Sequence, residues 1–403
     1  METSQYDIAI IGGGILGLST AMQLAEKAPQ WKVAVLEKEE ELATHQTGHN
    51  SGVLHSGIYY RPGSHKAQFC VAGLNNLVKF CDENEIEYQR CGKVIVATHE
   101  SELGRLQDLY DRGTANGVPD LEVVGPERLK EIEPYVSGVK ALWAPHTGIV
   151  DFAKVAGVYA NKFQQAGGDI FTGAPVHKIT RSPGSVSLET VKGTLQAKNL
   201  INCAGLYADK VATMSGEKVG VRIIPFRGEY YTLKPESHHL VNGLIYPVPD
   251  PRFPFLGVHY TRNIHGHVEA GPNAVLALRR EGYRKRDFSL SESLGSLAYP
   301  GFWKMSAKFW KIGMGEIYRS YSKGVFLKDL QRLLPEIQNS DLASGGSGVR
   351  AQAVASDGTL LDDFSIIEGQ GSIHVLNAPS PGATSSYAIG EHIAGLAVNN
   401  FGA

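Results

Sequence analysis

The chain has 403 residues, which is too long for one ordinary hydrophobic core, so we expect two closely connected domains. Hydrophobic residues make up 42% and charged residues 20%, as is typical of a soluble globular protein. The net charge of -2 argues against a nucleic-acid-binding protein, which would carry a basic excess. No apolar run approaches the roughly 20 residues that span a bilayer, and no signal-peptide pattern opens the sequence. The composition therefore favours a cytoplasmic protein.

The four cysteines indicate neither a disulfide framework nor a metal site. Cys70, Cys81, Cys91 and Cys203 have no CxxC spacing and no histidine partners at the intervals typical of zinc ligands. We therefore expect them to be reduced and buried, in a reducing compartment, and we expect no bound metal.

A glycine-rich turn follows the first predicted strand, residues 6–11. Gly12, Gly14 and Gly17 have the GxGxxG spacing, and apolar residues then recur every 3.6 residues, which predicts a helix. Gly12 permits the tight turn, Gly14 lets a pyrophosphate approach the backbone, and Gly17 allows close packing of helix on strand. The free amides at the start of the helix would bind the phosphates.

A second strand, residues 32–36, ends at Glu37, twenty residues after Gly17. An acidic side chain at this position can accept hydrogen bonds from the ribose hydroxyls of an adenosine. The succession of strand, glycines, helix, strand and acid therefore predicts a dinucleotide-binding domain.

The segment after this acid favours FAD over NAD. Residues 43–52 are small and polar and could pass beneath a bulky cofactor, whereas an NAD-binding domain normally continues with a crossover helix. A solvated polar loop is the alternative. Later, a strand at residues 200–203 runs into Ala204 and Gly205, a turn that many flavoproteins place near FAD. Val176, further upstream, could meet the adenine edge.

The carboxy-terminal segment closes the same domain. Residues 372–376 predict a strand and residues 385–398 a helix, with a loop rich in Pro and Gly between them. Gly382 and the next amides would then lie at a helix amino terminus, where they could stabilise negative charge on a reduced flavin. An ordinary loop before a helix is the alternative.

These arguments predict an α/β protein, α+β overall, in which a Rossmann-like FAD-binding domain carries an inserted mixed-sheet substrate domain. The FAD-binding domain is expected to be discontinuous and to comprise residues 1–82, 145–210 and 341–403. Residues 83–144 and 211–340 would form the substrate domain. The residues predicted to bind the cofactor are Gly12, Gly14, Ile15, Gly17, Glu37, Lys38, Thr44, Thr47, Asn50, Ser51, Val176, Ala204, Gly205, Pro381, Gly382, Ala383 and Thr384.

One stretch of the predicted substrate domain is strongly basic. Residues 279–332 hold twelve Lys/Arg and five acidic residues, so their net charge is +7 and that of the remaining chain is -9. Within the basic amphipathic segment at 283–328, four residues share one helical face: Trp303, Ala307, Trp310 and Met314. A helix of this kind can lie on an anionic membrane surface. A helix packed on its own protein with a solvated basic face is the alternative, which is slightly favoured.

Four stretches together carry a family resemblance. Residues 49–60, 255–259, 271–274 and 377–384 resemble the L-2-hydroxyglutarate dehydrogenase/oxidase family, within the D-amino-acid-oxidase-like flavoproteins. The resemblance implies FAD-dependent oxidation of L-2-hydroxyglutarate to 2-oxoglutarate, with a quinone or oxygen as electron acceptor. Bacterial relatives deliver electrons to membrane quinones, which would place the basic segment on the inner face of the cell membrane.

The resemblance also bears on the attachment of the flavin and on the substrate carboxylate. It implies non-covalent FAD, although His45, His49 or Cys70 could in principle carry the flavin covalently. It further implies that an arginine at position 350 holds the substrate carboxylate, and that a His or Arg lies near His55.

Oxidation of a 2-hydroxy acid needs a cation for the carboxylate, a base for the hydroxyl proton, and a C2–H bond directed at flavin N5. Arg350 suits the first role because a guanidinium binds a carboxylate through two hydrogen bonds. For the base, His55 is the first choice and His259 the second, since the unperturbed pKa of histidine lies near working pH. Other substrate-binding candidates are Tyr60, Arg61 and Tyr260. The second carboxylate could meet Arg61, Arg227, Tyr260 or His259.

Other functions fit the same fold. An amine oxidase of the glycine or sarcosine type would share the fold and the arginine, but it needs no strong base if the amine arrives neutral. A glycerol-3-phosphate dehydrogenase would need several cations for the phosphate. Outside the enzymes, the chain could be a non-catalytic FAD-binding subunit or a membrane-docked scaffold.

Overall fold

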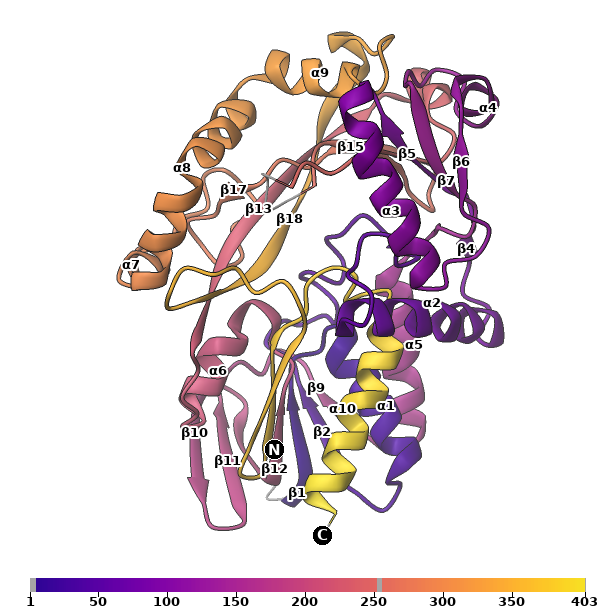
Figure 1. Ribbon diagram of the computed structural model, residues 1–403. Coiled ribbons are helices and arrows are strands. Elements are labelled where there is room, and N and C mark those ends of the chain that lie inside the picture. Colours follow the sequence, from indigo (N-terminus) through magenta and orange to yellow (C-terminus); the bar gives the residue numbers. More distant parts are fainter. Residues whose placement is uncertain (1–4, 252–255, 403) are drawn as a thin grey trace.

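The computed structural model describes residues 5–251 and 256–402, and Figure 1 shows two large sheets, one above the other, flanked by helices. The lower, eight-stranded sheet consists of β1 (Gln5–Ile11), β2 (Val33–Leu36), β9 (Asp169–Phe171), β10 (Val176–Ser182), β11 (Ser185–Thr190), β12 (Gly193–Asn202), β19 (Ser365–Gly369) and β20 (Ser372–Asn377). Its centre is parallel, in the order β9-β2-β1-β12-β20. This arrangement confirms the Rossmann-like prediction.

Four helices cover one face of this sheet: α1 (Ile15–Lys27), α2 (His65–Glu83), α5 (Phe152–Gln165) and α10 (Ser386–Phe401). Strand β1 is apolar because both of its faces are buried. The helices cover one face, and the hairpin of β10 and β11, with α6 (Ala208–Met214), contributes to the core on the other face. Ile10 and Leu18 belong to the helix-covered core, whereas Ala9 and Leu200 belong to the second. The sequence of a parallel strand that is covered on both faces is a continuous apolar run, and residues 8–11 form such a run.

The upper, nine-stranded sheet belongs to the inserted domain. Its strands are β5 (Lys93–Ala97), β6 (Glu122–Val124), β7 (Lys140–Ala144), β13 (Val221–Leu233), β14 (Leu244–Pro247), β15 (His259–Arg262), β16 (Val268–Gly271), β17 (Val275–Leu276) and β18 (Leu342–Ala355). Only β5 and β14 pair in parallel. A small third sheet joins β3 (Val53–Leu54), β8 (Gly148–Val150) and β4 (Tyr88–Gln89).

The two faces of the upper sheet have different cores. One face packs on α4 (Pro126–Ile132) and α9 (Lys323–Gln331), through residues such as Phe326 and Leu330. The other face packs on α3 (Leu103–Ala115) and on Val53 and Ile58 of the cofactor domain. The second face is therefore the one that is turned to the cofactor domain.

Strand β18 corrects one predicted domain boundary. Residues 341–403 were all assigned to the FAD-binding domain, but residues 342–355 pair with β13 along almost its whole length. The carboxy-terminal return to the lower sheet begins only with β19. Strand β18 is rich in Gly and Ser near its start, a composition that does not favour a strand.

The basic segment forms α7 (Leu290–Leu297) and α8 (Pro300–Tyr321), on the outer edge of the inserted domain (Figure 1). Helix α8 packs on the protein through Phe302 and Met305. Trp303, Trp310 and Met314 are 58%, 59% and 60% exposed, so the apolar face noted in the sequence points to solvent. The helix thus packs on its own protein and leaves its lysines in solvent, as the slightly favoured alternative expected, but the contact is made through Phe302 and Met305. No described helix is long and apolar enough to cross a membrane.

All four cysteines are free thiols. Cys70 and Cys81 are buried as expected, whereas Cys91 and Cys203 are only half-buried.

Candidate active site

The glycine-rich turn connects β1 to α1 and leaves little room for side chains. Gly12 has φ = 115°, and a Cβ there would collide with the carbonyl of Cys203 at the end of β12. A Cβ on Gly17 would collide with the carbonyl of Gly12. Gly14 is different, because an added Cβ would meet only Thr47 Oγ1, at 3.4 Å. The backbone is thus open at Gly14, which a bound pyrophosphate requires.

Glu37 lies at the end of β2 and is only 8% exposed. Its Oε2 accepts a hydrogen bond from the amide of Gly13 (2.7 Å) and its Oε1 one from the amide of Glu39 (2.9 Å). Each carboxylate oxygen has a second lone pair for a ribose hydroxyl. The Glu37 carbonyl accepts from the amide of Ala174 (2.8 Å), which brings the start of β10, with Val176, beside the same place.

Residues 43–52 form the loop that the sequence placed beneath the flavin. Thr47 Oγ1 accepts a hydrogen bond from the amide of Ile15 (3.0 Å) and so caps the start of α1. Asn50 uses its side chain within the loop, since Nδ2 donates to the carbonyls of Gln46 and Thr47 and Oδ1 accepts from the amide of Gly52. Thr44 is exposed and donates to the carbonyl of Glu41. Asn50 and Thr44 are therefore better described as loop residues than as cofactor ligands, while nothing in the structure distinguishes a role for Ser51.

The carboxy-terminal loop lies directly against this region. Thr384 Oγ1 accepts from the amide of His55 (3.1 Å) and donates to the carbonyl of Val53 (3.1 Å). The amide of Gly382 donates to the carbonyl of Pro379, so it is not free for an anion. Among the described residues nothing accepts from the amides of Ala383 and Thr384, so these two are the free donors before α10.

The structure thus brings the predicted cofactor residues together at the carboxyl ends of β1, β2 and β12. Ala204 and Gly205 follow β12 directly, and the latter (φ = 51°) faces Gln46 of the flavin loop. These features fit FAD: an open helix amino terminus, a buried acid for the ribose and a polar loop beneath the ring.

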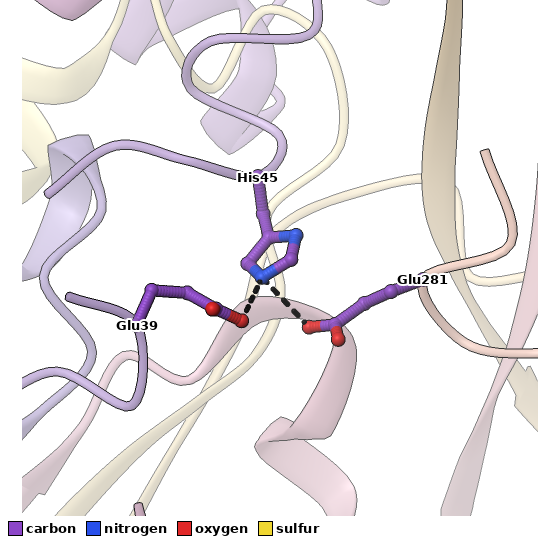
Figure 2. A group of neighbouring side chains, drawn as sticks. All are labelled: Glu39, His45 and Glu281. Carbon is purple, nitrogen blue, oxygen red and sulfur yellow. Dashed lines mark hydrogen bonds and ion pairs between the residues drawn. The ribbon is translucent and has the colours of Figure 1, made fainter. Parts of the chain in front are cut away.

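Lys38 belongs instead to a network of charges between the two domains. Figure 2 shows His45 of the flavin loop between Glu39 and Glu281, with Nε2 to carboxylate distances of 2.8 and 3.0 Å. The three side chains could hold a metal ion, but Lys38 Nζ lies 2.7 Å from Glu281 and 2.6 Å from His45, and it also pairs with Glu39. The ammonium occupies the position that a cation would take. We interpret the group as an inter-domain ion-pair network.

A row of side chains crosses the face of the upper sheet that is turned to the cofactor. The strand registers place Tyr246 beside His259, His259 opposite Gly271, and Gly271 beside Tyr230. Gly271 has no side chain, and a Cβ there would lie 3.0 Å from the ring of Tyr230. Tyr230 therefore fills the space that a side chain at position 271 would take, next to His259.

His259 is buried in this row. Its Nδ1 lies 2.9 Å from the carbonyl of Gly257, so that nitrogen carries the proton and Nε2 keeps its lone pair. Burial, together with the charges of Lys93 and Arg350, lowers the pKa of His259 to about 4, although the hydrogen bond to Gly257 raises it. The side chain is therefore neutral at physiological pH and able to accept a proton.

His55 lies between the flavin loop and the carboxy-terminal loop. Its Nε2 is 3.3 Å from Ser380 Oγ, and its Nδ1 is buried without a hydrogen-bond partner among the described residues. Burial, Lys93 and His259 lower the pKa of His55 to about 3. Tyr60 also meets the carboxy-terminal loop, since a hydrogen bond with Ser380 partly offsets the burial that raises the pKa of its phenol.

Arg350 lies on β18 opposite Phe226, with its side chain exposed. Its charge acts on His259 and on Tyr230, whose pKa it lowers against the larger effect of burial. The charge of Arg350 therefore reaches His259, the other residue that the sequence proposes for the substrate on this face.

Three predicted substrate residues do not join this site. Tyr260 follows His259 in the strand and so points to the opposite face, where its hydroxyl donates to the carbonyl of Leu330 (3.1 Å) in the core. Arg227 is buried and paired with Glu229 (2.9 Å). Arg61 is exposed at the surface. Of the family stretch 255–259, Phe255 lies outside the described residues.

The sequence reasoning missed Lys93, which begins β5 and is 1% exposed. Its Nζ lies 4.8 Å from the ring centroid of Tyr59 and 5.0 Å from that of Tyr246. One signal was present in the sequence: a single lysine heads an otherwise apolar strand, residues 93–97. Nothing local, however, placed that strand next to the one that carries Tyr246.

Together these features define a two-domain flavoprotein oxidoreductase, and comparison with known proteins agrees. Residues 7–396 match the family described as FAD dependent oxidoreductase. The chain is 53% identical to an L-2-hydroxyglutarate dehydrogenase of Indibacter alkaliphilus, over 98% of this chain and 100% of the relative. It is 47% identical to the mitochondrial L-2-hydroxyglutarate dehydrogenase of Homo sapiens, over 98% and 89%. The chain therefore belongs to the FAD dependent oxidoreductase family and to its L-2-hydroxyglutarate dehydrogenase branch.

Solved structures show the same fold at much lower identity. An L-alpha-glycerophosphate oxidase from Mycoplasma pneumoniae with FAD bound has a TM-score of 0.79 at 22% identity, covering 99% of this chain and 95% of that one. Glycine oxidase from Geobacillus kaustophilus has a TM-score of 0.73 at 20% identity, covering 99% and 96%. These structures confirm the predicted fold class, and the family match over residues 7–396 shows that FAD is the cofactor.

Proposed function

We propose that the protein oxidises L-2-hydroxyglutarate to 2-oxoglutarate with FAD. The observation that carries the proposal is the neutral, buried His259 next to two cations, Lys93 and Arg350. A dianionic 2-hydroxy acid needs positive charge for its carboxylates and a neutral base for its hydroxyl. Curated relatives that cover almost the whole chain carry the name of this activity.

Different residues of the chain perform different steps of the proposed reaction. Arg350 holds the carboxylate next to C2, and the hydroxyl is presented to a histidine. When bound, FAD supplies the acceptor for the hydride that leaves C2. The histidine takes the hydroxyl proton as the C2=O double bond forms, so the two electrons and the proton are all accounted for. Tyr60 closes the site beside the carboxy-terminal loop.

His55 is the base that we prefer, with His259 as its partner. The backbone amide of His55 is bound to Thr384 of the carboxy-terminal loop, and Nδ1 of His55 has no described partner, so a substrate hydroxyl can take that place. Both histidines are weak bases, first because they are buried and also because nearby charges, Lys93 in both cases, lower their pKa values. A bound dicarboxylate brings negative charge beside them and so raises both pKa values.

The cofactor is proposed to be bound without a covalent bond. Cys70 is buried, its thiol lies 3.2 Å from the carbonyl of His55, and burial raises its pKa to about 12. A thiol of this kind is a poor nucleophile. His45 is engaged by Glu39 and Glu281, and His49 stacks on Tyr283 with ring centroids 4.2 Å apart. Release of all yellow colour on acid precipitation is the expected result.

A single turnover tests the proposed reaction. Protein with one FAD per chain is mixed with excess L-2-hydroxyglutarate without oxygen, and 2-oxoglutarate is quantified after quenching. One equivalent of 2-oxoglutarate per FAD is expected, and none with the D-enantiomer. Formation of less than a tenth of an equivalent from the L-acid would refute the proposed substrate.

The electron acceptor is proposed to be a membrane quinone, reached from the cytoplasmic side. Of the 13 large apolar side chains that are exposed in the described chain, ten lie between residues 288 and 321. They are Phe288, Leu290, Leu294, Leu297, Trp303, Trp310, Met314, Ile317, Tyr318 and Tyr321. Exposed Lys304, Lys308 and Lys311 lie among them. Aromatic side chains combined with lysines suit the interface of an anionic membrane.

Vesicle flotation tests this membrane contact. The wild type is expected to float with vesicles that contain anionic phosphatidylglycerol and to stay behind with neutral phosphatidylcholine. The variant Trp303→Ser/Trp310→Ser should lose flotation while it keeps its FAD and its turnover with a soluble dye. Equal flotation of wild type and variant would show that this face is not the contact, and oxygen would remain as the acceptor.

A further inference from the structure

Lys93 is a buried cation for which the described residues provide no acid. It is 1% exposed, and no described carboxylate is among the groups whose charge acts on it. The rings of Tyr59 and Tyr246 lie on its ammonium at 4.8 and 5.0 Å. Two aromatic rings stabilise a buried cation only in part, because its N–H donors still lack acceptors.

Two neighbouring polar groups also lack partners. The hydroxyl of Tyr59 and Nδ1 of His55 are both buried without a hydrogen-bond partner among the described residues. Lys93 acts on His55 electrostatically and touches the ring of Tyr59, so the three groups belong to one place. Buried polar groups are almost always satisfied in proteins, so the unpartnered hydroxyl of Tyr59 beside the ammonium of Lys93 indicates a site for an anion.

The strand order shows that the group formed by Lys93, Tyr59 and His55 lies at a distance from Arg350. Across the upper sheet the order is β18-β13-β16-β15-β14-β5, so β15, with His259, lies between β18, with Arg350, and β5, with Lys93. Both cations act on His259. Arg350 is exposed, at the open side of the site, and Lys93 is at its buried end.

We infer that Lys93 and the hydroxyl of Tyr59 form the subsite for the second, distal carboxylate of the substrate. This inference rests on the proposed function, in which Arg350 holds the carboxylate next to C2. The ammonium and the phenol each donate a hydrogen bond to the distal carboxylate, and the carboxylate supplies the missing counter-charge. Lys93 is thereby the residue that selects dicarboxylates over 2-hydroxy acids with an apolar end.

The test compares binding of two unreactive acids to FAD-loaded protein, followed by the change in the flavin spectrum. Glutarate carries both carboxylates, and pentanoate is of the same length but carries one. Wild type should bind glutarate at least about 30-fold more tightly, since a buried charged hydrogen bond discriminates by one to two orders of magnitude. Lys93→Met should reduce this preference to within about threefold, and Tyr59→Phe should reduce it by about tenfold.

Lys140→Met is the matched control. Lys140 lies in β7, the strand that pairs with β5, but its side chain is exposed. This variant should keep the wild-type preference. FAD content and Tm are measured for each protein, and Lys93→Arg is included as a variant that keeps the charge and should keep most of the preference.

The pH dependence provides a second, independent measurement. The pKa of Lys93 is about 8, lowered by burial, so the glutarate Kd of the wild type should rise above pH 8, while that of Lys93→Arg stays flat. The ionisable groups that face Lys93 are Cys70, Cys91, Tyr59, Tyr246, His55 and His259. The thiols and phenols have pKa values raised by burial and the histidines are neutral at pH 7, so none of them should titrate near pH 8.

Two results would overturn the subsite. One is an unchanged preference for glutarate in Lys93→Met, and the other is an equal loss of glutarate and pentanoate binding, which would mark Lys93 as structural. Failure of the proposed function looks different. In that case wild-type FAD is not reduced by L-2-hydroxyglutarate, while the preference of glutarate over pentanoate still depends on Lys93.

Discussion

The imidazole of His259 stacks on the phenol ring of Tyr246, with ring centroids 4.0 Å apart and planes inclined by 28°. The two residues are direct neighbours on β15 and β14, and Tyr246 in turn covers the ammonium of Lys93. The stack fixes the plane of the histidine, and the carbonyl of Gly257 fixes its tautomer. A base held in this way presents its free Nε2 in one direction, which is what proton transfer from an oriented hydroxyl requires.

The two histidines should differ in their effect on turnover. We expect His55→Asn to lower kcat by about 10²- to 10⁴-fold, the range typical of a lost general base, and His259→Asn to lower it by less. Stopped-flow measurement of flavin reduction separates this step from reoxidation. A larger loss in His259→Asn than in His55→Asn would reverse the assignment of the base.

Arg350→Ala should weaken substrate binding far more than it slows reduction at saturation. Loss of one partner of a charge-assisted pair costs about 2–4 kcal/mol, so the Kd of substrate should rise by roughly 30- to 1000-fold. Saturation of anaerobic flavin reduction gives this constant. Unchanged saturation behaviour would remove Arg350 from the site.

Gly14→Ala should separate cofactor binding from folding. The added Cβ meets only Thr47 Oγ1 at 3.4 Å, and Gly14 has φ = -83°, which alanine adopts freely. The FAD-free protein should therefore keep its Tm within about 2 °C, while the FAD Kd rises about tenfold or more because the pyrophosphate is crowded. Gly17→Ala is the contrast, because its Cβ would collide with the carbonyl of Gly12 and so destabilise the fold itself. Equal FAD affinity of wild type and Gly14→Ala would place the pyrophosphate elsewhere.

His374 should make the protein less stable in acid. It is fully buried in β20, with Nδ1 3.1 Å from the side-chain Nδ2 of Asn202, and burial lowers its pKa to about 4. The native state thus binds fewer protons than the unfolded state between the unfolded pKa, about 6.5, and the folded one. The stability due to neutral His374 is complete above pH 6.5 and falls by up to about 1.4 kcal/mol per unit as the pH drops toward 4.

Urea denaturation at pH 7.5 and pH 5 measures this effect. The free energy of unfolding should fall more steeply in the wild type than in His374→Gln, which cannot take up the proton. Parallel pH dependence of the two proteins would assign the acid lability to other groups.

The sequence could predict that the proposed cofactor residues come together, because their determinants are local. Gly12, Gly17 and Glu37 lie within one βαβ unit, so their spacing alone predicts that they meet at the carboxyl ends of β1 and β2. Tyr260 was assigned wrongly. Strand alternation shows that Tyr260 and His259 point to opposite faces of the sheet, but it does not show which face is turned to the cofactor. Lys93 was missed for a related reason, since its neighbours Tyr59 and Tyr246 come from distant segments that only the sheet register brings together.

For α8, too, the sequence could not show which residues face the rest of the protein. Periodicity predicted that Trp303, Trp310 and Met314 share a face, which the structure confirms. It could not tell which of two apolar faces is buried, because Phe302 and Met305 form a second one. Helix α8 uses the latter to pack on the protein.

Anaerobic reduction of the flavin tests the central claim most directly. The purified yellow protein is mixed with L-2-hydroxyglutarate without oxygen, and absorbance near the flavin maximum is followed. The D-enantiomer, glycine, sarcosine and glycerol 3-phosphate serve as controls. Rapid bleaching by L-2-hydroxyglutarate alone is the predicted result, and bleaching by an amine or by glycerol 3-phosphate, with none by the L-acid, would contradict it.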